Sequence, residues 1–215
     1  MRVIVTRPRA QAEPLLAALD AEGFDPIACP VIEVQPIDDG AIDVTGYDWV
    51  IVTSANGAAE LAKRHEGGLP RIAAVGETTA AALEAHGIRV DFVPSLASQE
   101  GLLAELPRPV GRALFVGAER ARTLLVDQLP ADFRPVYRTL ALRPQPPDGD
   151  LVLLASPSAA RAWADLHSAL PAISIGPQTT AAALAAGLTV VAEAETQDVA
   201  GLVNSAASWR ASSPS

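Results

Sequence analysis

The sequence has few of the residues that proteins use to hold metals. Its 215 residues include one cysteine and three histidines. One cysteine cannot form an intramolecular disulfide, an iron–sulfur cluster or a cysteine-based zinc site. His65, His86 and His167 are scattered and form no metal motif such as HExxH. We therefore expect no bound metal.

Motifs for nucleotides and covalent cofactors are also missing. Lys63 is the only lysine, and it does not stand in the GK[ST] context of a Walker A loop. It is also the only candidate for a Schiff base, and it lies beside Arg64 and His65 in a polar helix end. Neither a GxGxxG dinucleotide motif nor a GxSxG nucleophile elbow occurs. If the protein is an enzyme, we expect it to use no cofactor.

The charge balance and the lack of long apolar runs exclude further classes. The 16 basic and 25 acidic residues give a net charge of −9, which argues against DNA or RNA as a partner. The longest apolar stretches have five to seven residues, far below the roughly 20 that span a bilayer. We expect a cytoplasmic protein without membrane contact, and nothing in the sequence calls for a dimer, so we expect a monomer.

Short β-branched runs alternate regularly with Ala- and Leu-rich helical segments. This alternation predicts an α/β protein with parallel sheets covered by helices on both faces. The expected strands are residues 2–6, 24–28, 47–53, 72–75, 90–93, 113–116, 134–137, 151–155, 173–175 and 190–192. The expected helices are 10–22, 57–65, 78–86, 100–106, 120–129, 159–166, 179–186 and 199–207, with a frayed tail at 205–215.

The chain repeats itself. AVGETTAAAL resembles SIGPQTTAAAL, which pairs Gly76 with Gly176 and Thr79 with Thr179 at an offset of 100. Downstream, SQEGLL from Ser98 resembles TQDVAGLV from Thr196, and we align these two serine and threonine positions. Other segments match at an offset near 109, among them FDPI and FRPV. The repeats predict two similar α/β units.

Two Pro-bounded extended segments, PVIEVQP and RTLALRP, alternate polar and apolar residues. We interpret them as two crossings between the units that pair with each other as a ladder. This makes one lobe discontinuous; the alternative is two consecutive domains split near Pro107–Pro109. The predicted parts are a lobe of 1–30 plus 150–215, connections at 31–44 and 134–149, and a lobe of 45–133.

Several turns that follow predicted strands are rich in Gly, Ser and Thr. In a parallel sheet these turns lie at the carboxyl ends of the strands, where ligands bind and where helix N-termini attract anions. The alternative is that the hydroxyls only cap their helices, and the two readings are compatible. The hydroxyl residues in question are Ser54, Thr79, Ser156 and Thr179.

Tyr137 is the one phenol with unusual placement, at the junction of the second crossing with the continuous lobe. Its hydroxyl could act as a weak general acid. The alternative is an aromatic residue that only packs at a hinge between lobes.

Taken together, these pieces resemble the uroporphyrinogen-III synthase family over nearly the whole chain. The matching segments, in order, are VTRPRAQ, TSANGA, AVGETTAAAL with HGI, SQEGLL, the Tyr137 region, ASPSAA, and SIGPQTTAAALAAGL with TQDVAGLV. The resemblance implies two flavodoxin-like α/β/α lobes of similar structure, joined by a two-stranded β ladder, one lobe being discontinuous.

The resemblance also implies a reaction and its residues. The family closes hydroxymethylbilane, a linear tetrapyrrole, into uroporphyrinogen III with loss of water and inversion of the last pyrrole ring, without a cofactor. The family's tyrosine falls on Tyr137, which we expect to assist departure of the hydroxyl. Expected substrate contacts are Thr79 and Thr179, the carboxylate-binding Ser54, Asn56, Gly57, Ser156 and Ser158, and the cationic Arg7 and Arg138.

Two other functions stay open at this point. Hinged α/β lobes also suit a non-catalytic binder or sensor of small anionic ligands. A flavodoxin-like protein could instead bind a flavin nucleotide. Glu77 departs from a simple carboxylate site, because it places a negative charge beside the Thr79 turn.

Overall fold

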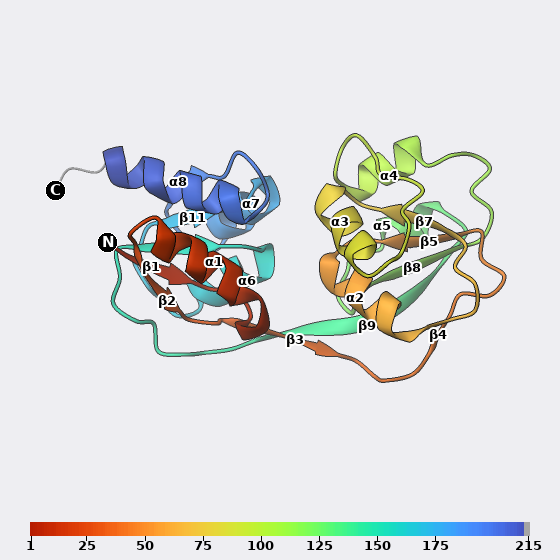
Figure 1. The fold of residues 1–215 in the computed structure, drawn as a ribbon, viewed down its shortest axis with the longest axis horizontal. Coiled ribbons are helices and arrows are strands. Elements are labelled where there is room, and N and C mark those ends of the chain that lie inside the picture. The colour runs from red at the N-terminus through yellow and green to blue at the C-terminus, as the bar shows by residue number, and fades with distance from the viewer. Residues whose placement is uncertain (213–215) are drawn as a thin grey trace. The chain divides into compact units, whose positions relative to one another are not determined.

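The computed structural model describes residues 1–212, and their contacts divide the chain into two compact units. Unit 1 consists of Met1–Glu33 and Leu140–Ser215, and unit 2 of Val34–Thr139. Both are built from parallel sheets and helices, which confirms the predicted α/β class (Figure 1). No helix in the described part of the chain is long and apolar enough to cross a membrane.

Unit 1 contains a five-stranded parallel sheet in the order β12-β11-β10-β1-β2. Val3–Val5 of β1 and Leu151–Leu154 of β10 are apolar and buried, as expected for strands covered on both faces. The bounds are β1 (Arg2–Val5), β2 (Asp25–Ala28), β10 (Leu151–Leu154), β11 (Ala172–Ser174) and β12 (Val190–Glu193).

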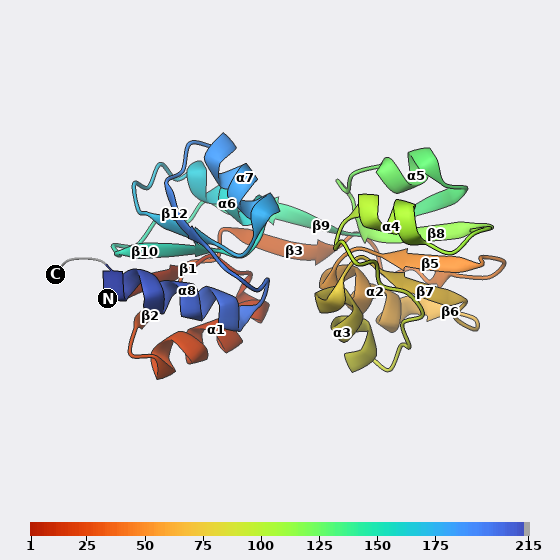
Figure 2. The same cartoon turned by 90° about the horizontal axis from the view of Figure 1, so that it is seen from above.

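Four helices cover the two faces of this sheet (Figure 2). Val3 and Val5 pack on one face against α1 (Arg9–Ala21) and α8 (Val199–Ser212). Ile4 points to the other face, against α6 (Pro157–Ala164) and α7 (Pro177–Ala185). Successive residues of a strand point to opposite faces, so one short strand supplies both cores.

Unit 2 has the sheet order β3-β9-β8-β5-β7, with a further parallel bridge from Ala73 to Phe92 beyond β7. The strands β9, β8, β5 and β7 are parallel. The bounds are β3 (Ile32–Pro36), β5 (Trp49–Val52), β7 (Arg71–Ala74), β8 (Ala113–Ala118) and β9 (Ala131–Ala141). A separate small sheet pairs β4 (Ile42–Asp43) with β6 (His65–Glu66).

The helices of unit 2 also lie on two faces. Val50 and Val52 pack with α2 (Ala55–Arg64) and α3 (Glu77–Ala85) in one core cluster, here called the α2/α3 core. Trp49 and Phe115 belong to the opposite cluster with α4 (Gln99–Glu105) and α5 (Leu124–Gln128), the α4/α5 core.

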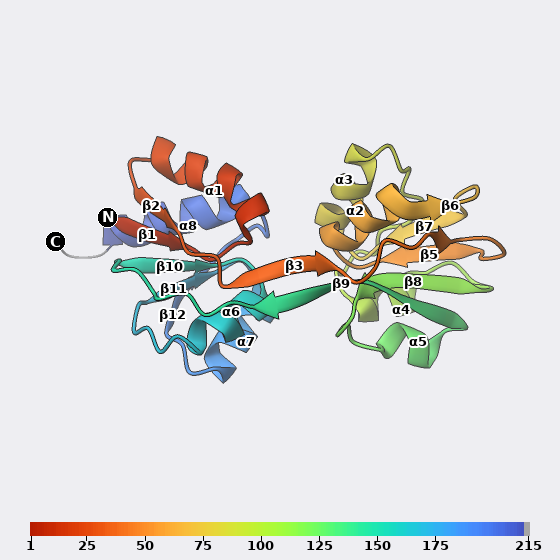
Figure 3. The ribbon, with the colours of Figure 1, turned by 90° about the horizontal axis from the view of Figure 1, so that it is seen from below.

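The chain passes between the units within β3 and returns within β9. Hydrogen bonds run from the Leu142 amide to the Val31 carbonyl and from the Ile37 amide to the Val136 carbonyl, at 2.8 and 3.2 Å. Along the first segment, from residue 31 to residue 37, the partners in the second segment run backwards from residue 142 to residue 136. The two segments are therefore antiparallel, as the arrows of β3 and β9 in Figure 3 show. The predicted strand 134–137 and the predicted crossing 138–144 form a single strand up to Ala141.

Both units share one strand order, which explains the sequence repeat. In unit 1, strands β10, β11, β12, β1 and β2 are counted as first to fifth, and their order across the sheet is then 3-2-1-4-5. In unit 2, strand β5, strand β7, the Phe92 bridge, β8 and β9 are counted in the same way, and they give the same order. The first half of each unit matches at an offset of 100. The second half of unit 1 comes from the N-terminus of the chain, so its segments precede their counterparts in sequence.

The structure corrects the predicted repeat register at α4 and α8. The Ser98 hydroxyl accepts from the Gly101 amide at 3.0 Å, and the Asp198 carboxylate accepts from the Gly201 amide at 2.7 Å. Ser98 and Asp198 are therefore equivalent capping residues, so the offset of 100 holds here too, whereas the sequence resemblance begins at Ser98 and Thr196. Serine and aspartate are exchangeable as caps because each offers an oxygen to the first helical turn.

Other predicted elements differ from the structure. The segment 90–93 forms only the Phe92 bridge instead of a strand. Helix α5 begins at Leu124 rather than at residue 120, because residues 119–123 form a turn and loop. Helix α8 continues to Ser212, so the tail predicted from residue 205 is helical that far, and the rest of it lies outside the described residues.

Candidate functional site

In each unit, the Gly- and hydroxyl-rich turns lie side by side at the carboxyl ends of neighbouring strands. In unit 2 the Val75 amide, just after β7, donates to the Val52 carbonyl at the end of β5, at 3.0 Å. In unit 1 the Ile175 amide donates to the Leu154 carbonyl in the same way, also at 3.0 Å. These are the edges where open parallel sheets bind ligands.

Ser54 and Ser156 cap the helices that begin there. Ser54 Oγ accepts from the Gly57 amide and Ser156 Oγ from the Ala159 amide, both at 3.1 Å. Ser156 Oγ also lies 3.1 Å from Ser158 Oγ. The capping interpretation is therefore confirmed for both serines. Each cap satisfies one of the first amides of its helix, whose other N-terminal amides have no partner within the helix.

Thr79 and Thr179 are not caps, so the capping interpretation is wrong for them. The capping residues are Gly76 and Gly176, and the threonines lie in the first helical turn, 5% and 2% exposed. A Cβ would come within 2.8 Å of Ala97 Cβ at Gly76 and 2.9 Å of Gln197 at Gly176. The close approach of the following loop therefore explains the glycines.

Asn56 and Gly57 form the first turn of α2 beside Ser54. Asn56 is half-buried, and Gly57 is buried. A Cβ at Gly57 would lie 3.3 Å from Ser54 Oγ and 3.4 Å from the Val116 carbonyl oxygen. Glycine thus lets α2 start directly against β8, which fixes the height of the Ser54 hydroxyl above the sheet.

The Tyr137 hydroxyl lies 3.0 Å from Ser54 Oγ. The Tyr137 side chain also packs in the α2/α3 core and is 7% exposed, so both predicted roles, proton donor and packing aromatic, fit its position. Ser54 already accepts from an amide and has one hydroxyl proton to give. When Ser54 donates this proton to the phenol oxygen, the Tyr137 proton is left for a ligand.

A β-bulge turns Tyr137 toward Ser54. Gly117 pairs with Pro135, but the next residue, Ala118, pairs with Tyr137, so Val136 is an extra residue in β9. Phe133 packs in the α4/α5 core, and strict alternation would place Tyr137 on that same face. Instead, Val136 and Tyr137 both join the α2/α3 core. Bulges commonly redirect a side chain in this way beside a functional site.

The two predicted cationic residues lie in different units. Arg7 follows β1 in unit 1, and burial lowers the pKa of its guanidinium. Arg138 follows Tyr137 in β9, and its Nε is buried without a hydrogen-bond partner in the described structure. An unsatisfied buried donor costs about 1–3 kcal/mol, so an anionic ligand that accepted from Arg138 would remove a penalty.

Sequence reasoning missed the contacts that hold the loop after β8. Gln99 Nε2 donates to the Arg122 carbonyl at 3.2 Å, and the Arg122 guanidinium pairs with both carboxylate oxygens of Glu100 at 2.7 and 3.0 Å. At the other end of this loop, the Glu119 amide donates to the Tyr137 carbonyl at 2.8 Å. The Ser98-Gln99-Glu100 segment, which resembles Thr-Gln-Asp at residues 196–198, was the only sequence signal for this arrangement.

We expect Glu100 to titrate unusually low. Hydrogen bonds from Arg122 lower the pKa of Glu100 to about 2, from an ordinary value of 4.5. A carboxylate whose pKa is lower in the folded state stabilises the folded protein at a pH above its ordinary pKa of 4.5. This stabilisation is lost as the pH falls toward 2. In NMR titration, Arg122→Gln should raise the Glu100 pKa toward 4.5; an unchanged midpoint would show that Arg122 is not its main partner.

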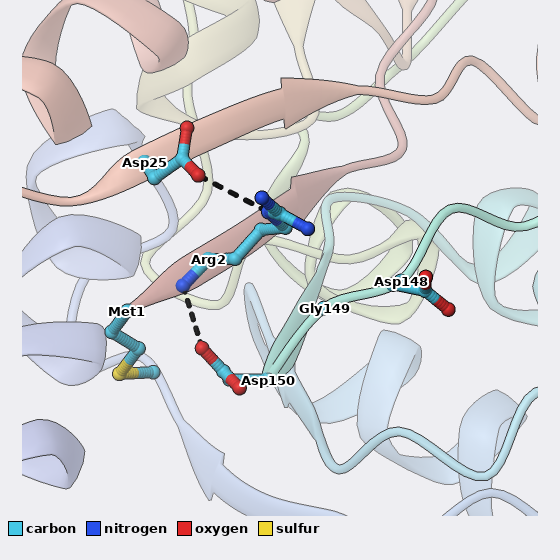
Figure 4. A pocket seen from close by; sticks show the side chains of 6 residues that line it. All are labelled: Met1, Arg2, Asp25, Asp148, Gly149 and Asp150. Carbon is cyan, nitrogen blue, oxygen red and sulfur yellow. Dashed lines mark hydrogen bonds and ion pairs between the residues drawn. The ribbon is translucent and has the colours of Figure 1, made fainter.

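Two surface hollows lie at the amino ends of strands, away from these turns. One, of about 380 Å³ in unit 1, is lined by the amino ends of β1, β2 and β10, where Arg2 binds Asp25 and Asp150 (Figure 4). A second, of about 500 Å³ in unit 2, lies at the start of β7 and includes Arg71. Within residues 1–212 no cluster of His, Cys, Asp and Glu could hold a metal ion.

Comparison with known proteins gives the same family at the level of sequence. The family model for uroporphyrinogen-III synthase HemD matches residues 13–204. The uroporphyrinogen-III synthase of Synechococcus elongatus is 31% identical over 132 residues, which are 54% of this chain and 50% of the relative. The chain spans 50% to 62% of the length of the first curated relatives it matches.

The fold has counterparts among solved structures. The uroporphyrinogen-III synthetase of Helicobacter pylori superposes with a TM-score of 0.67 at 19% identity, over 98% of this chain and all of that one. The Thermus thermophilus enzyme, a mutant uroporphyrinogen III synthase, gives 0.65 at 17% identity, over 99% of this chain. At such identities the likeness shows a shared fold. With a family model that covers most of its residues, the chain belongs to the uroporphyrinogen-III synthase family.

Proposed function

We propose that this protein is a uroporphyrinogen-III synthase, which closes hydroxymethylbilane into uroporphyrinogen III with loss of water and inversion of ring D. The observation that carries the proposal is the Tyr137 hydroxyl held 3.0 Å from the capping Ser54 at the carboxyl edge of the unit 2 sheet. Membership of the family supplies the reaction. The site supplies a proton donor beside a helix N-terminus, which suits an anionic substrate.

Tyr137 gives its proton to the terminal hydroxyl of the substrate, which leaves as water. The substrate then carries an azafulvene cation-like centre, and Tyr137 is left as a phenolate. The Ser54 hydroxyl stabilises this phenolate by donating to it, since a hydrogen bond to a charged oxygen is about twice as strong as a neutral one. The proton lost from the pyrrole during ring closure restores Tyr137.

Positioning supplies the rest of catalysis, because unguided closure gives the unrearranged isomer. A binding site that holds the linear tetrapyrrole in the reactive conformation makes a conformation that is rare in solution the bound one. In unit 2 we propose Asn56, Thr79 and Arg138 as donors to substrate carboxylates. Ser54 and Gly57 form the turn of this binding site, because the Gly57 amide already donates to Ser54 Oγ and the Ser54 proton is directed to Tyr137. The proposed donors of unit 1 are Arg7, Ser156, Ser158 and Thr179.

The finer architecture is part of the proposal. We propose two flavodoxin-like lobes, 1–30 plus 150–215 and 45–133, joined by a ladder of the connections 31–44 and 134–149. When the strands of unit 1 are numbered in chain order (β1, β2, β10, β11, β12), their order across the sheet is 2-1-3-4-5. This is the flavodoxin order, which supports a flavodoxin-like lobe. We further propose that the protein is a cytoplasmic monomer that needs no cofactor, metal or nucleic acid.

Product analysis tests the function directly. Freshly made hydroxymethylbilane is incubated with the protein, and the type I and type III products are separated by chromatography. The proposal predicts an excess of type III over the type I product of spontaneous closure. A binder of small anions would leave the spontaneous product distribution unchanged, and a flavin protein would purify with a yellow colour.

The threonines test whether each unit binds substrate. Thr79→Ala and Thr179→Ala each remove a buried hydroxyl that does not cap its helix, so we expect a rise in KM of about 10-fold for a lost hydrogen bond to a carboxylate. Thr78→Ala and Gln178→Ala, one position earlier in the same helices, serve as matched controls. Unchanged steady-state kinetics in a folded Thr variant would remove that residue from the site.

A further inference from the structure

Arg64 lies at the end of α2, at the opposite end of that helix from Ser54. Its side chain is 4% exposed, which is unusual for an arginine. Arg64 Nη1 lies 3.0 Å from the Asp38 carboxylate and also binds the Asp38 carbonyl, and Nε lies 3.1 Å from Glu60. The two carboxylates compensate the buried charge.

The remaining nitrogen of Arg64 reaches the bulge. Arg64 Nη2 donates to the Val136 carbonyl at 3.4 Å, and the Ile37 amide donates to the same oxygen at 3.2 Å. Val136 is the extra residue that shifts Tyr137 onto the face of Ser54. The guanidinium therefore connects the segment after β3, helix α2 and the bulge in β9.

From this geometry we propose that Arg64 is a positioning residue for Tyr137, acting through the bulge carbonyl of Val136. The inference rests on the proposed function, because it assigns Arg64 a part in the same proton transfer. Without the bulge, Tyr137 would face the α4/α5 core, on the side of the sheet away from Ser54. Arg64 holds the conformation in which the phenol and the Ser54 hydroxyl meet.

The role requires an arginine rather than any cation. A guanidinium presents several donors in a rigid fork, whereas an ammonium is a single point of charge on a flexible stem. Lysine at position 64 would keep the charge facing Asp38 and Glu60 but could not also hold the Val136 carbonyl. Arg64→Lys therefore removes the contact to the bulge while leaving a cation in place.

Arg134 offers a matched control. Its guanidinium binds the same Asp38 oxygen at 3.0 Å, and it also lies on β9. Among the described residues, the donors to the Val136 carbonyl are Arg64 and Ile37, not Arg134. Arg134→Lys perturbs the same carboxylate without touching the bulge. A difference between the two lysine variants therefore reports on the contact with Val136.

NMR of the tyrosine ring tests the positioning without reference to activity. The chain has two tyrosines, so protein labelled with 13C at tyrosine Cζ gives two signals, assigned by Tyr47→Phe and Tyr137→Phe. Ser54→Ala marks where the Tyr137 signal lies when its hydrogen bond is lost. Arg64→Lys should move the signal toward that position, and Arg134→Lys should leave it. An unchanged Tyr137 signal in Arg64→Lys would overturn the proposal.

Kinetics test whether Arg64 acts through Tyr137. We expect Arg64→Lys to lower kcat about 10-fold, as a small misplacement of a reacting group does, with KM changed less than about twofold. In the Tyr137→Phe background the same substitution should have almost no further effect on kcat. Equal, additive losses in both backgrounds would show a general structural role and contradict the proposal.

The two readouts separate this inference from the proposed function. A wild-type protein that makes no type III product while Arg64→Lys still moves the Tyr137 signal would refute the function and keep the positioning. If Arg64→Lys does not fold, the pair Arg64→Met with Glu60→Gln replaces it, since exchanging a buried ion pair for neutral groups is often tolerated and Asp38 keeps Arg134 as its partner. The same NMR and kinetic outcomes then decide.

Discussion

Tyr137→Phe should lower turnover of hydroxymethylbilane by about 100-fold or more, which is the usual contribution of a general acid. The substitution removes one oxygen and keeps the ring that packs in the α2/α3 core. KM should change little, because the carboxylate donors stay in place. The measurement is the initial rate of type III product formation, at substrate concentrations that separate kcat from KM.

Tyr47→Phe is the matched control, since Tyr47 is the only other tyrosine and binds Asp132 at 2.8 Å. It should turn over substrate at the wild-type rate. Tyr137→Phe also loses its hydrogen bond with Ser54, which costs about 1 kcal/mol of stability, so both variants are compared well below their melting temperatures. A loss of less than threefold in folded Tyr137→Phe would remove Tyr137 from the role of acid.

Gly101→Ala and Gly201→Ala should each destabilise the protein by about 3 kcal/mol. A Cβ at Gly101 would lie 2.1 Å from the Leu96 carbonyl oxygen, and one at Gly201 would lie 2.1 Å from the Thr196 carbonyl oxygen. These atoms belong to the backbone, so neither loop can yield without losing its capping bond. The expected loss of stability is opposite in sign to the effect of helix propensity, which favours alanine over glycine in a helix by about 1 kcal/mol.

Thermal unfolding by circular dichroism measures this effect, and a loss of this size corresponds to a fall in Tm of about 6–12 °C. Gly101 belongs to unit 2 and Gly201 to unit 1, so each substitution tests one unit. Gly68→Ala is the control, because a Cβ there meets no atom within 4 Å. An unchanged or raised Tm in either variant would show that its loop adapts more easily than the structure indicates.

Local sequence patterns were enough for most elements because each depends on near neighbours. The strand Trp49–Val52 is apolar throughout. Ser54 caps the helix that follows it by accepting from the amide of Gly57, three residues later. The expected strands and helices around these residues agree with the structure to within a few positions. The predicted strand 90–93 is wrong because a strand also needs a partner along its length, and only Phe92 finds one.

The candidate site depended more on contacts between distant segments. The capping interpretation was wrong for Thr79 because the loop that carries Ala97 determines the start of α3 by packing on Gly76. The contact between Ser54 and Tyr137 joins residues 83 positions apart and requires an extra residue in β9. No local sequence pattern predicts the bulge at Val136, since Val136 and Tyr137 are equally suited to a regular strand.

The sequence by itself determined the α/β class, the two repeated halves, the strand-to-helix turns and the choice of Tyr137 as the candidate acid. These follow from periodicity, capping and turn chemistry, which act over a few residues, and from the resemblance of ordered motifs. The tertiary structure decided which face Tyr137 occupies, which threonines are not caps, and that buried Arg64 reaches the bulge. Those features depend on strand register and on packing between segments far apart in the chain, which become definite only when the sheet is assembled.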